Sequence, residues 1–460
     1  MKDNICDLLI KTYNVNKIDS ALIELKDALR DRAIKCCNEN PKNPNERIIL
    51  KKLINNYFNP KIQQPKPKYI AGPITLTVHE SLDKERIVYI FGEVHTDVKN
   101  CKMFQDKEDK EDEKWNEENP DKMTIDFFLY ELMKTTTAYL DIYFEFAAFE
   151  KTMGGYYSYF SGGPPNTHID NLFKKFKKCI ELPSKSTSSR STGDCELARV
   201  HFFDSRMINS KDGATDVFVL IEKIFYLQTN YPKDINKYIE LRKKYKYILN
   251  SLIEKDEKNY LDFWKKELRT KLNIKETKSG PYESLASINE RQIMEKIKDF
   301  TEKEIERKAT RYRNKFKELV TTIFESEKNI IDAFKSLNAY MIDTNSTVAD
   351  VYLLARMFKD FDMTKIKTHA NNITDQPDKA YNVIIYAGEG HSTIYRRYLK
   401  QNGFKRIART GKDDTDAKNC IDMRRIPPFF SKLSWKDLWS EYIVTPEEYE
   451  YKTFKDLINI

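Results

Sequence analysis

The sequence predicts an α/β protein with a central, mostly parallel sheet flanked by helices, a large helical insertion and N-terminal helices. Short β-branched and aromatic runs such as RIVYIFG (86–92) and YNVIIYAG (381–388) are typical of strands buried on both faces. Helical segments alternate with such runs towards both ends of the chain, and parallel strands are joined through helices. In such a sheet we expect the binding crevice at the carboxyl ends of the strands.

The pattern divides the chain into five segments. Apolar residues at helical spacing predict helices near the N-terminus, and a proline-rich linker follows them. The expected segments are an N-terminal helical segment (1–60), the first half of the α/β domain (70–210), the helical insertion (211–340), the second half of the α/β domain (341–412) and a C-terminal extension (413–460).

Each half of the α/β domain has its own expected elements. The first half should contain strands at 74–80, 86–92, 138–146 and 197–205, a helix at 123–136, a charged solvated loop at 98–122, a Gly-rich loop at 153–165 and a Ser/Thr-rich loop at 184–194. The second half should contain a well-packed helix at 346–361, a strand at 381–388, and a helix and strand (HSTIYRRYLKQNG, FKRIARTG) that complete a β-α-β unit. Between them, long charged amphipathic patterns predict an almost entirely helical stretch.

Composition excludes several classes of protein. The 79 Lys and Arg against 71 Asp and Glu leave +8, which is too mild to imply a nucleic-acid partner. No run is long and apolar enough for a membrane span, and the start is too polar for a signal peptide, so we expect an intracellular protein. Seven scattered cysteines do not indicate a zinc ribbon or a disulfide scaffold. Abundant Lys, Asn and Ile suggest an AT-rich genome such as that of a large DNA virus, which would place the protein in the host cytoplasm or the virion.

A repeated element is the sharpest feature of the sequence. Gly92-Glu93-Val94-His95 follows the run IVYIF, and Gly388-Glu389-Gly390-His391 follows NVIIYA. From the Gly and acidic content, a Gly-acid-x-His match at a given histidine should arise roughly once in a few hundred cases, so two matches are not expected by chance. A single such His is more often a turn or core residue. The pair indicates a site, which requires that the two strands lie close together in the sheet.

These residues resemble the TraB/Tiki family of the erythromycin esterase/ChaN/Tiki-like superfamily. The resemblance rests on the paired G-x-x-H motifs and on Tyr395, Leu399, Gly403 and Phe404 after the second one, and it covers about 70–206 and 345–410. It implies an α/β sheet enclosed by helices and a metal-dependent hydrolase of peptide or ester bonds. The long helical stretch and the N-terminal helices depart from the family. P-loop, dinucleotide-binding, zincin and G-x-S-x-G patterns are absent from the sequence.

The leading hypothesis is one divalent ion (Mn, Co or Zn) held by His95, Glu145 and His391. Glu145 in DIYFEF matches the position of a family glutamate, although an ordinary strand end is the alternative. Glu93 or Glu389 would be the remaining ligand or the general base for a bound water.

Further polar residues follow the strands. Asp97 could orient His95 or cap a helix. The strand RVHFFDSR ends with His201, Asp204 and Arg206, of which His201 and Asp204 would support the site residues. Arg206 would hold an anionic substrate group or oxyanion, and Arg356 is a weaker candidate of the same kind. A structural salt bridge of Asp204 with Arg206 or Arg199 is the alternative.

Two readings of function stay open. In the first, the protein hydrolyses a peptide or small ester substrate, with a metal-free acid–base variant as in the esterase branch. In the second, it is a catalytically silent α/β scaffold, or a virion or nucleic-acid-associated protein that binds a partner through the basic, Tyr-rich helical insertion. The sequence does not indicate an oligomeric state.

Overall fold

The computed structural model describes residues 65–94, 119, 121–136, 139–145, 175, 180–181, 188–191, 195, 198–203, 216–271, 291–361, 379–411, 420–427 and 429. The helices expected at 1–60 and the Gly-rich loop at 153–165 lie outside these residues. So does nearly all of the charged loop at 98–122.

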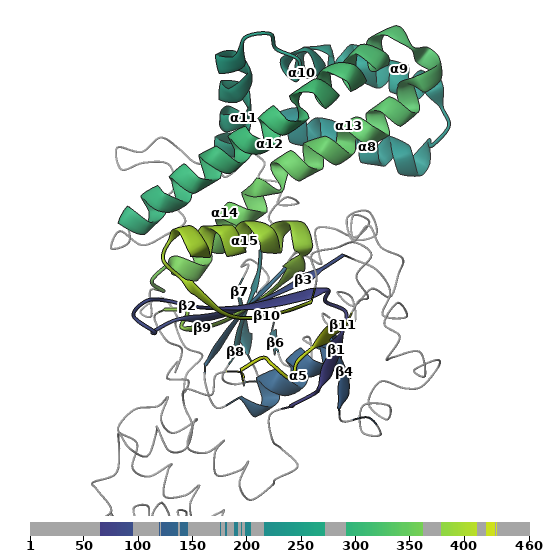
Figure 1. Ribbon diagram of the computed structural model, residues 1–460. Coiled ribbons are helices and arrows are strands. Elements are labelled where there is room, and N and C mark those ends of the chain that lie inside the picture. Colours follow the sequence, from purple (N-terminus) through teal and green to yellow (C-terminus); the bar gives the residue numbers. More distant parts are fainter. Residues whose placement is uncertain are drawn as a thin grey trace, which may run out of the picture.

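An eight-stranded sheet forms the centre of the α/β part, with strand order β10-β2-β3-β9-β5-β8-β7-β6 (Figure 1). The strands in chain order are β2 (Thr75–Glu80), β3 (Ile87–Glu93), β5 (Leu140–Phe144), β6 (Ile180–Glu181), β7 (Ser188–Ser191), β8 (Ala198–Phe202), β9 (Asn382–Gly388) and β10 (Lys405–Gly411). A second, three-stranded sheet has the order β11-β1-β4, with β1 (Tyr69–Ala71), β4 (Lys122–Thr124) and β11 (Cys420–Asp422). The expected α/β fold class is therefore confirmed.

The four central strands, β3, β9, β5 and β8, are parallel, and the outer strands add to them in antiparallel fashion. Strand β9 comes late in the chain but lies between β3 and β5, so two early strands are separated by a late one. Such a reversal of strand order opens a crevice at the carboxyl ends of the strands. Both Gly-Glu-x-His motifs follow strands that flank this point.

Side chains alternate between two buried layers, as parallel central strands require. In β3, Val88 and Ile90 belong to one apolar cluster, whereas Tyr89 and Phe91 belong to the other. Helices α14 (Thr347–Phe358) and α15 (Glu389–Gln401) contribute to the first cluster, and α5 (Ile125–Thr135) contributes to the second. Figure 1 shows α15 on one side of the sheet and α5 on the other.

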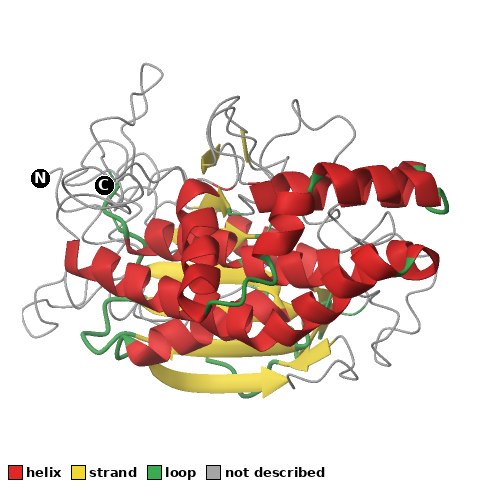
Figure 2. Ribbon diagram, turned by 90° about the horizontal axis from the view of Figure 1, so that it is seen from above, coloured by secondary structure: helices red, strands yellow, loops and turns green. Residues whose placement is uncertain are grey.

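The expected helical insertion is present as a set of packed helices. They are α8 (Asp216–Asn230), α9 (Ile235–Lys244), α10 (Lys246–Ser251), α11 (Glu257–Lys271), α12 (Arg291–Glu325), the short 3-10 helix η8 (Glu327–Asn329) and α13 (Ile330–Asn345). Seen from above, these helices lie over the strands and extend beyond them (Figure 2).

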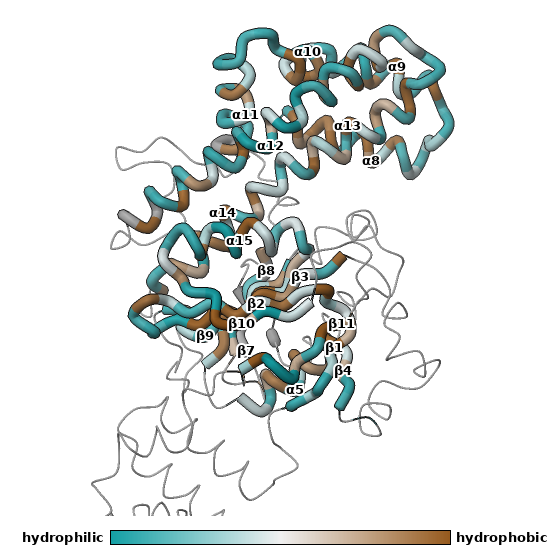
Figure 3. The backbone as a smooth tube through the Cα atoms, viewed as in Figure 1, coloured by the Kyte–Doolittle hydropathy of each residue, from teal (hydrophilic) through white to brown (hydrophobic). Residues whose placement is uncertain are grey.

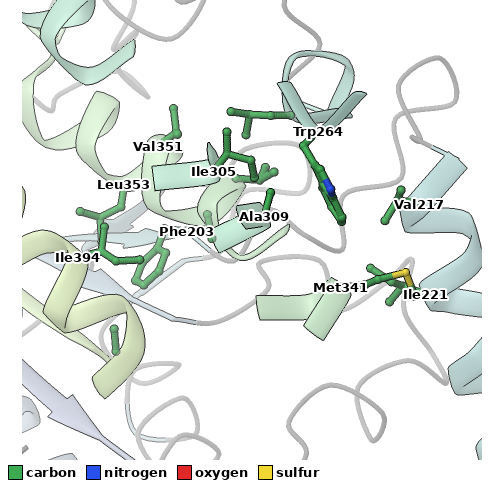
Figure 4. Packing of buried hydrophobic residues seen from close by; sticks show 14 of the residues in the cluster. Phe203, Val217, Ile221, Trp264, Ile305, Ala309, Met341, Val351, Leu353 and Ile394 are labelled. Carbon is green, nitrogen blue, oxygen red and sulfur yellow. The ribbon is translucent and has the colours of Figure 1, made fainter. Parts of the chain in front are cut away.

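The helical region shares one apolar core with the sheet. Trp264 of α11 and Met341 of α13 belong to the same buried cluster as Phe203, which follows β8, and Ile394 of α15 (Figure 4). An ion pair also joins the two parts: Arg397 of α15 pairs with Glu304 of α12, and Glu304 is only 5% exposed. The insertion is thus a packed layer of the fold and not a detached appendage.

Some local expectations need correction. Part of the expected Ser/Thr-rich loop forms β7, because its residues pair with β8 on one side and with β6 on the other. Cys195 and Cys420 each take part in a disulfide bond, which the scattered spacing of the cysteines did not indicate. None of the helices that the structure describes has the length and apolar character needed to cross a membrane.

Candidate functional site

The carboxyl ends of the parallel strands bring parts of the two motifs to one edge of the sheet. Glu93 at the end of β3 is in register with Gly388 at the end of β9, and Phe144 of β5 is in register with Tyr386. Glu145 follows directly after β5. The strands that carry the motifs are therefore neighbours, as the pairing hypothesis requires.

His391 lies in the first turn of α15 between two carboxylates. Its Nδ1 is 2.5 Å from Oδ1 of Asp350, and its Nε2 is 3.2 Å from Oε1 of Glu145. The imidazole is only 8% exposed. Burial alone would lower the pKa of His391, but the charges of Glu145 and Asp350 outweigh burial and raise it to about 10.

Glu145 is fixed by backbone as well as by His391. Its Oε2 accepts a 2.7 Å hydrogen bond from the N–H of Gly388, the first residue of the second motif. The side chain is 8% exposed, so a carboxylate is held at the end of an apolar strand. Burying such a charge is costly unless hydrogen bonds and cations compensate. This observation supports the placement of Glu145 in a site.

Asp350 belongs to the same group and was not among the residues predicted from the sequence. It lies on α14 among buried apolar neighbours and is 1% exposed. Its Oδ2 has no hydrogen-bond partner among the described residues. One signal was present: an acidic residue interrupts the apolar pattern TVADVYLLA, which is unfavourable unless the carboxylate meets a polar partner.

Glu93 lies at the same edge but on the other face of the sheet. Its Oε2 accepts a hydrogen bond from the hydroxyl of Tyr386, which belongs to the apolar layer covered by α5. Burial and the charge of Glu93 raise the pKa of the Tyr386 hydroxyl well above its usual value. The body of β9 therefore separates Glu93 from His391.

Glu389 is held by a different set of contacts. It forms an ion pair with Arg396, seven residues or about two turns along α15, and the Thr75 hydroxyl donates a 2.5 Å hydrogen bond to it. A Cβ at Gly92 would lie 1.8 Å from Oε2 of Glu389. Only a glycine at position 92, in the first motif, therefore leaves room for the Glu389 side chain of the second motif.

His201 is part of a separate buried cluster. Its Nε2 is 2.7 Å from Asp141, which also binds Arg199 through two hydrogen bonds of 2.6 and 3.0 Å. Burial outweighs the nearby carboxylate and lowers the pKa of His201 to about 4. Arg356 approaches the other ring nitrogen at 3.5 Å. His201 therefore contacts Asp141 and Arg356 rather than the His391 group.

Four predicted residues, His95, Asp97, Asp204 and Arg206, lie outside the described residues. Within the described part of the chain, no group of three or more His, Cys, Asp or Glu side chains is arranged to hold a metal ion. The expected ligand set of His95, Glu145 and His391 is thus represented by its last two members.

Comparisons with known proteins give no assignment. No family model, no curated protein and no solved structure matches this chain.

Proposed function

We propose that this protein is a hydrolase of peptide or ester bonds of the TraB/Tiki type, dependent on a divalent ion such as Mn, Co or Zn. One observation carries the proposal: the His391 imidazole lies between Asp350 and Glu145 at the carboxyl ends of parallel strands. Imidazole nitrogen and carboxylate oxygen are suitable donors for these ions.

The donor chemistry of the described residues fits an ion. Asp350 occupies Nδ1 of His391, so Nε2 is the nitrogen left facing Glu145. A carboxylate on the outer nitrogen of a ligating histidine is the usual supporting arrangement, because it fixes the ring orientation and makes the other nitrogen a better donor. His391 and Glu145 would hold the ion, with His95 as the third ligand by the motif.

When bound, the ion would lower the pKa of a water molecule and polarise the scissile carbonyl. The chain's own residues prepare this chemistry. Asp350 holds the imidazole in one orientation, and the Gly388 N–H holds Glu145. Neither motif glutamate is assigned as general base, because Glu93 lies on the other face of the sheet with Tyr386, and the charge of Glu389 is neutralised by Arg396.

Metal-dependent thermal stability tests the proposal. Wild type should be stabilised by added Mn or Zn, and Glu145→Gln should weaken metal affinity by about tenfold or more, because a neutral amide is a poor ligand for a divalent cation. Glu240→Gln, which changes a glutamate that is 68% exposed on α9, is the matched control and should behave as wild type.

The same samples separate the alternatives. A wild type that neither binds metal nor hydrolyses model peptides and esters would refute the hydrolase and leave the scaffold reading. Hydrolysis that persists in the presence of a chelator but depends on His391 would refute the metal requirement and favour the metal-free acid–base mechanism. An unchanged metal response in Glu145→Gln would remove Glu145 from the ligand set.

A further inference from the structure

Exposed large apolar side chains are concentrated in one short stretch of the helical region. The part of the chain that the structure describes exposes six of them, and four fall between residues 226 and 247. Three are tyrosines, Tyr226, Tyr231 and Tyr247, which are 51, 38 and 75% exposed. Isolated exposed apolar residues need no explanation, but several exposed aromatic rings within one short segment are typical of a binding site.

Lysines accompany these tyrosines. Lys243, Lys244 and Lys246 are exposed at the junction of α9 and α10, directly before Tyr247. Lys237 lies over the Tyr231 ring at 5.9 Å. We call Tyr226, Tyr231, Tyr247, Lys243, Lys244 and Lys246 the tyrosine–lysine surface. These residues come from α8, the α8–α9 connection and the α9–α10 junction, in a helical region where Figure 3 shows much hydrophilic colour.

The exposure of these rings is not a general property of the helices. Other aromatic residues of the helical region, Tyr238, Tyr260 and Trp264, are at most 1% exposed and pack in the core. Tyr226 and Tyr231 instead lie against each other, with ring centroids 5.9 Å apart. The helical region therefore has enough core to bury tyrosines, yet leaves these three in water.

We propose that the tyrosine–lysine surface binds single-stranded nucleic acid. Bases stack on exposed aromatic rings whatever their sequence, and lysines pair with the phosphates between them. Helix α9 has ten residues and so spans about 15 Å between the two ends of the surface, which suits a strand of a few nucleotides.

A membrane surface fits these residues less well. A helix that lies on a bilayer buries a broad apolar face of Leu, Phe or Trp. Between residues 226 and 247, all of which the structure describes, the exposed large apolar side chains are one aliphatic residue, Ile235, and the three tyrosines. The charge excludes a basic partner. A nucleic-acid strand is the anionic partner that uses both the rings and the lysines.

Fluorescence anisotropy with labelled single-stranded DNA and RNA of about 16 nucleotides tests the proposal on the full chain. Wild type should bind both at about 50 mM salt. Tyr226→Ser, Tyr231→Ser and Tyr247→Ser should each weaken binding by roughly fivefold or more. Changing Lys243, Lys244 and Lys246 to Glu should abolish most binding and reduce the salt slope by about 2.

The matched control makes the same three charge changes on α12, at exposed Lys296, Lys303 and Lys317. These variants should keep most of the affinity. Equal losses in the two lysine sets would show diffuse electrostatic attraction and overturn the proposal, as would the absence of binding by wild type. Binding to vesicles that contain anionic lipid but not to either oligonucleotide would also overturn it. Circular dichroism of each variant separates these results from unfolding.

Discussion

Replacing Asp141 with asparagine tests how the centre of the sheet is held together. Asp141 is fully buried on β5, and its two oxygens accept hydrogen bonds from Arg199 of the neighbouring strand β8. Burial would raise the pKa of Asp141, but the charge of Arg199 and the hydrogen bond of His201 lower it below its usual range. The carboxylate is therefore charged in the folded protein at neutral pH.

The size of the effect follows from burial on both sides of the ion pair. Arg199 is 3% exposed, and it also stacks on Phe361, with 3.7 Å between its guanidinium carbon and the ring centroid. Asp141→Asn keeps the shape but removes the charge that offsets the buried guanidinium. Breaking a buried pair in this way costs about 3–5 kcal/mol. Arg199→Met should cost a similar amount, and the double variant should cost clearly less than the sum.

Urea unfolding followed by circular dichroism at pH 7 measures these differences. The control is Asp422→Asn, because Asp422 pairs with Arg424 at a position where the two side chains are 40 and 59% exposed. That pair should contribute no more than about 1 kcal/mol. A loss below about 1 kcal/mol for Asp141→Asn, or strictly additive single variants, would refute the view that the pair is screened from water.

Three further predictions concern single positions. His201 has a folded-state pKa of about 4 against an ordinary value of 6.5, so the unfolded chain binds the extra proton and stability falls as the pH drops from about 6.5 to 4. In urea unfolding, His201→Gln should therefore remove about 2 kcal/mol of the stability that wild type loses between pH 7 and 5. An unchanged loss would contradict this prediction. Gly92→Ala should displace Glu389 and lower stability by about 1–3 kcal/mol, whereas a melting temperature equal to wild type would show that the glutamate moves freely. Asp350→Asn should weaken binding of Mn or Zn by about 10- to 100-fold in calorimetric titration while leaving the metal-free protein folded; unchanged affinity would mean that Asp350 does not support His391.

The sequence predicted most elements because their patterns are local. The run RIVYIFG became β3 and YNVIIYAG became β9, and the helix expected at 346–361 became α14. The Ser/Thr-rich segment was interpreted wrongly, because its residues have no apolar periodicity and β7 is defined by its pairing with β8 and β6. Strands near the edge of a sheet depend on their neighbours, which a local pattern does not show.

The partners of the candidate residues were harder to predict. The order of the strands decides which side chains meet, and it places β9 between β3 and β5. Asp141 and Asp350 each meet a histidine 41 or more residues away. The alternative salt bridge considered for Arg199 was to Asp204, whereas its buried partner is Asp141. Neither pairing can be read from spacing along the chain, because both depend on tertiary contacts.

Two histidine–carboxylate groups on β5 illustrate why one is interpreted as structural and the other as functional. Asp141 and Glu145 flank Tyr143, two residues away on either side, and each contacts a buried histidine. Burial lowers the pKa of His201 to about 4 and keeps it neutral, and the guanidinium of Arg199 balances the charge of Asp141.

Beside Glu145, a second carboxylate, Asp350, takes the place of the arginine. The hydrogen-bonded group of two carboxylates and one imidazole therefore carries an excess of negative charge, whichever protonation state His391 adopts. Buried carboxylates attract a cation, and at this position a proton on His391 or a divalent ion can supply the positive charge. Beside His201 an arginine completes the ion pair, whereas beside His391 an aspartate lies in the corresponding place. The His391 group therefore favours the binding of a cation.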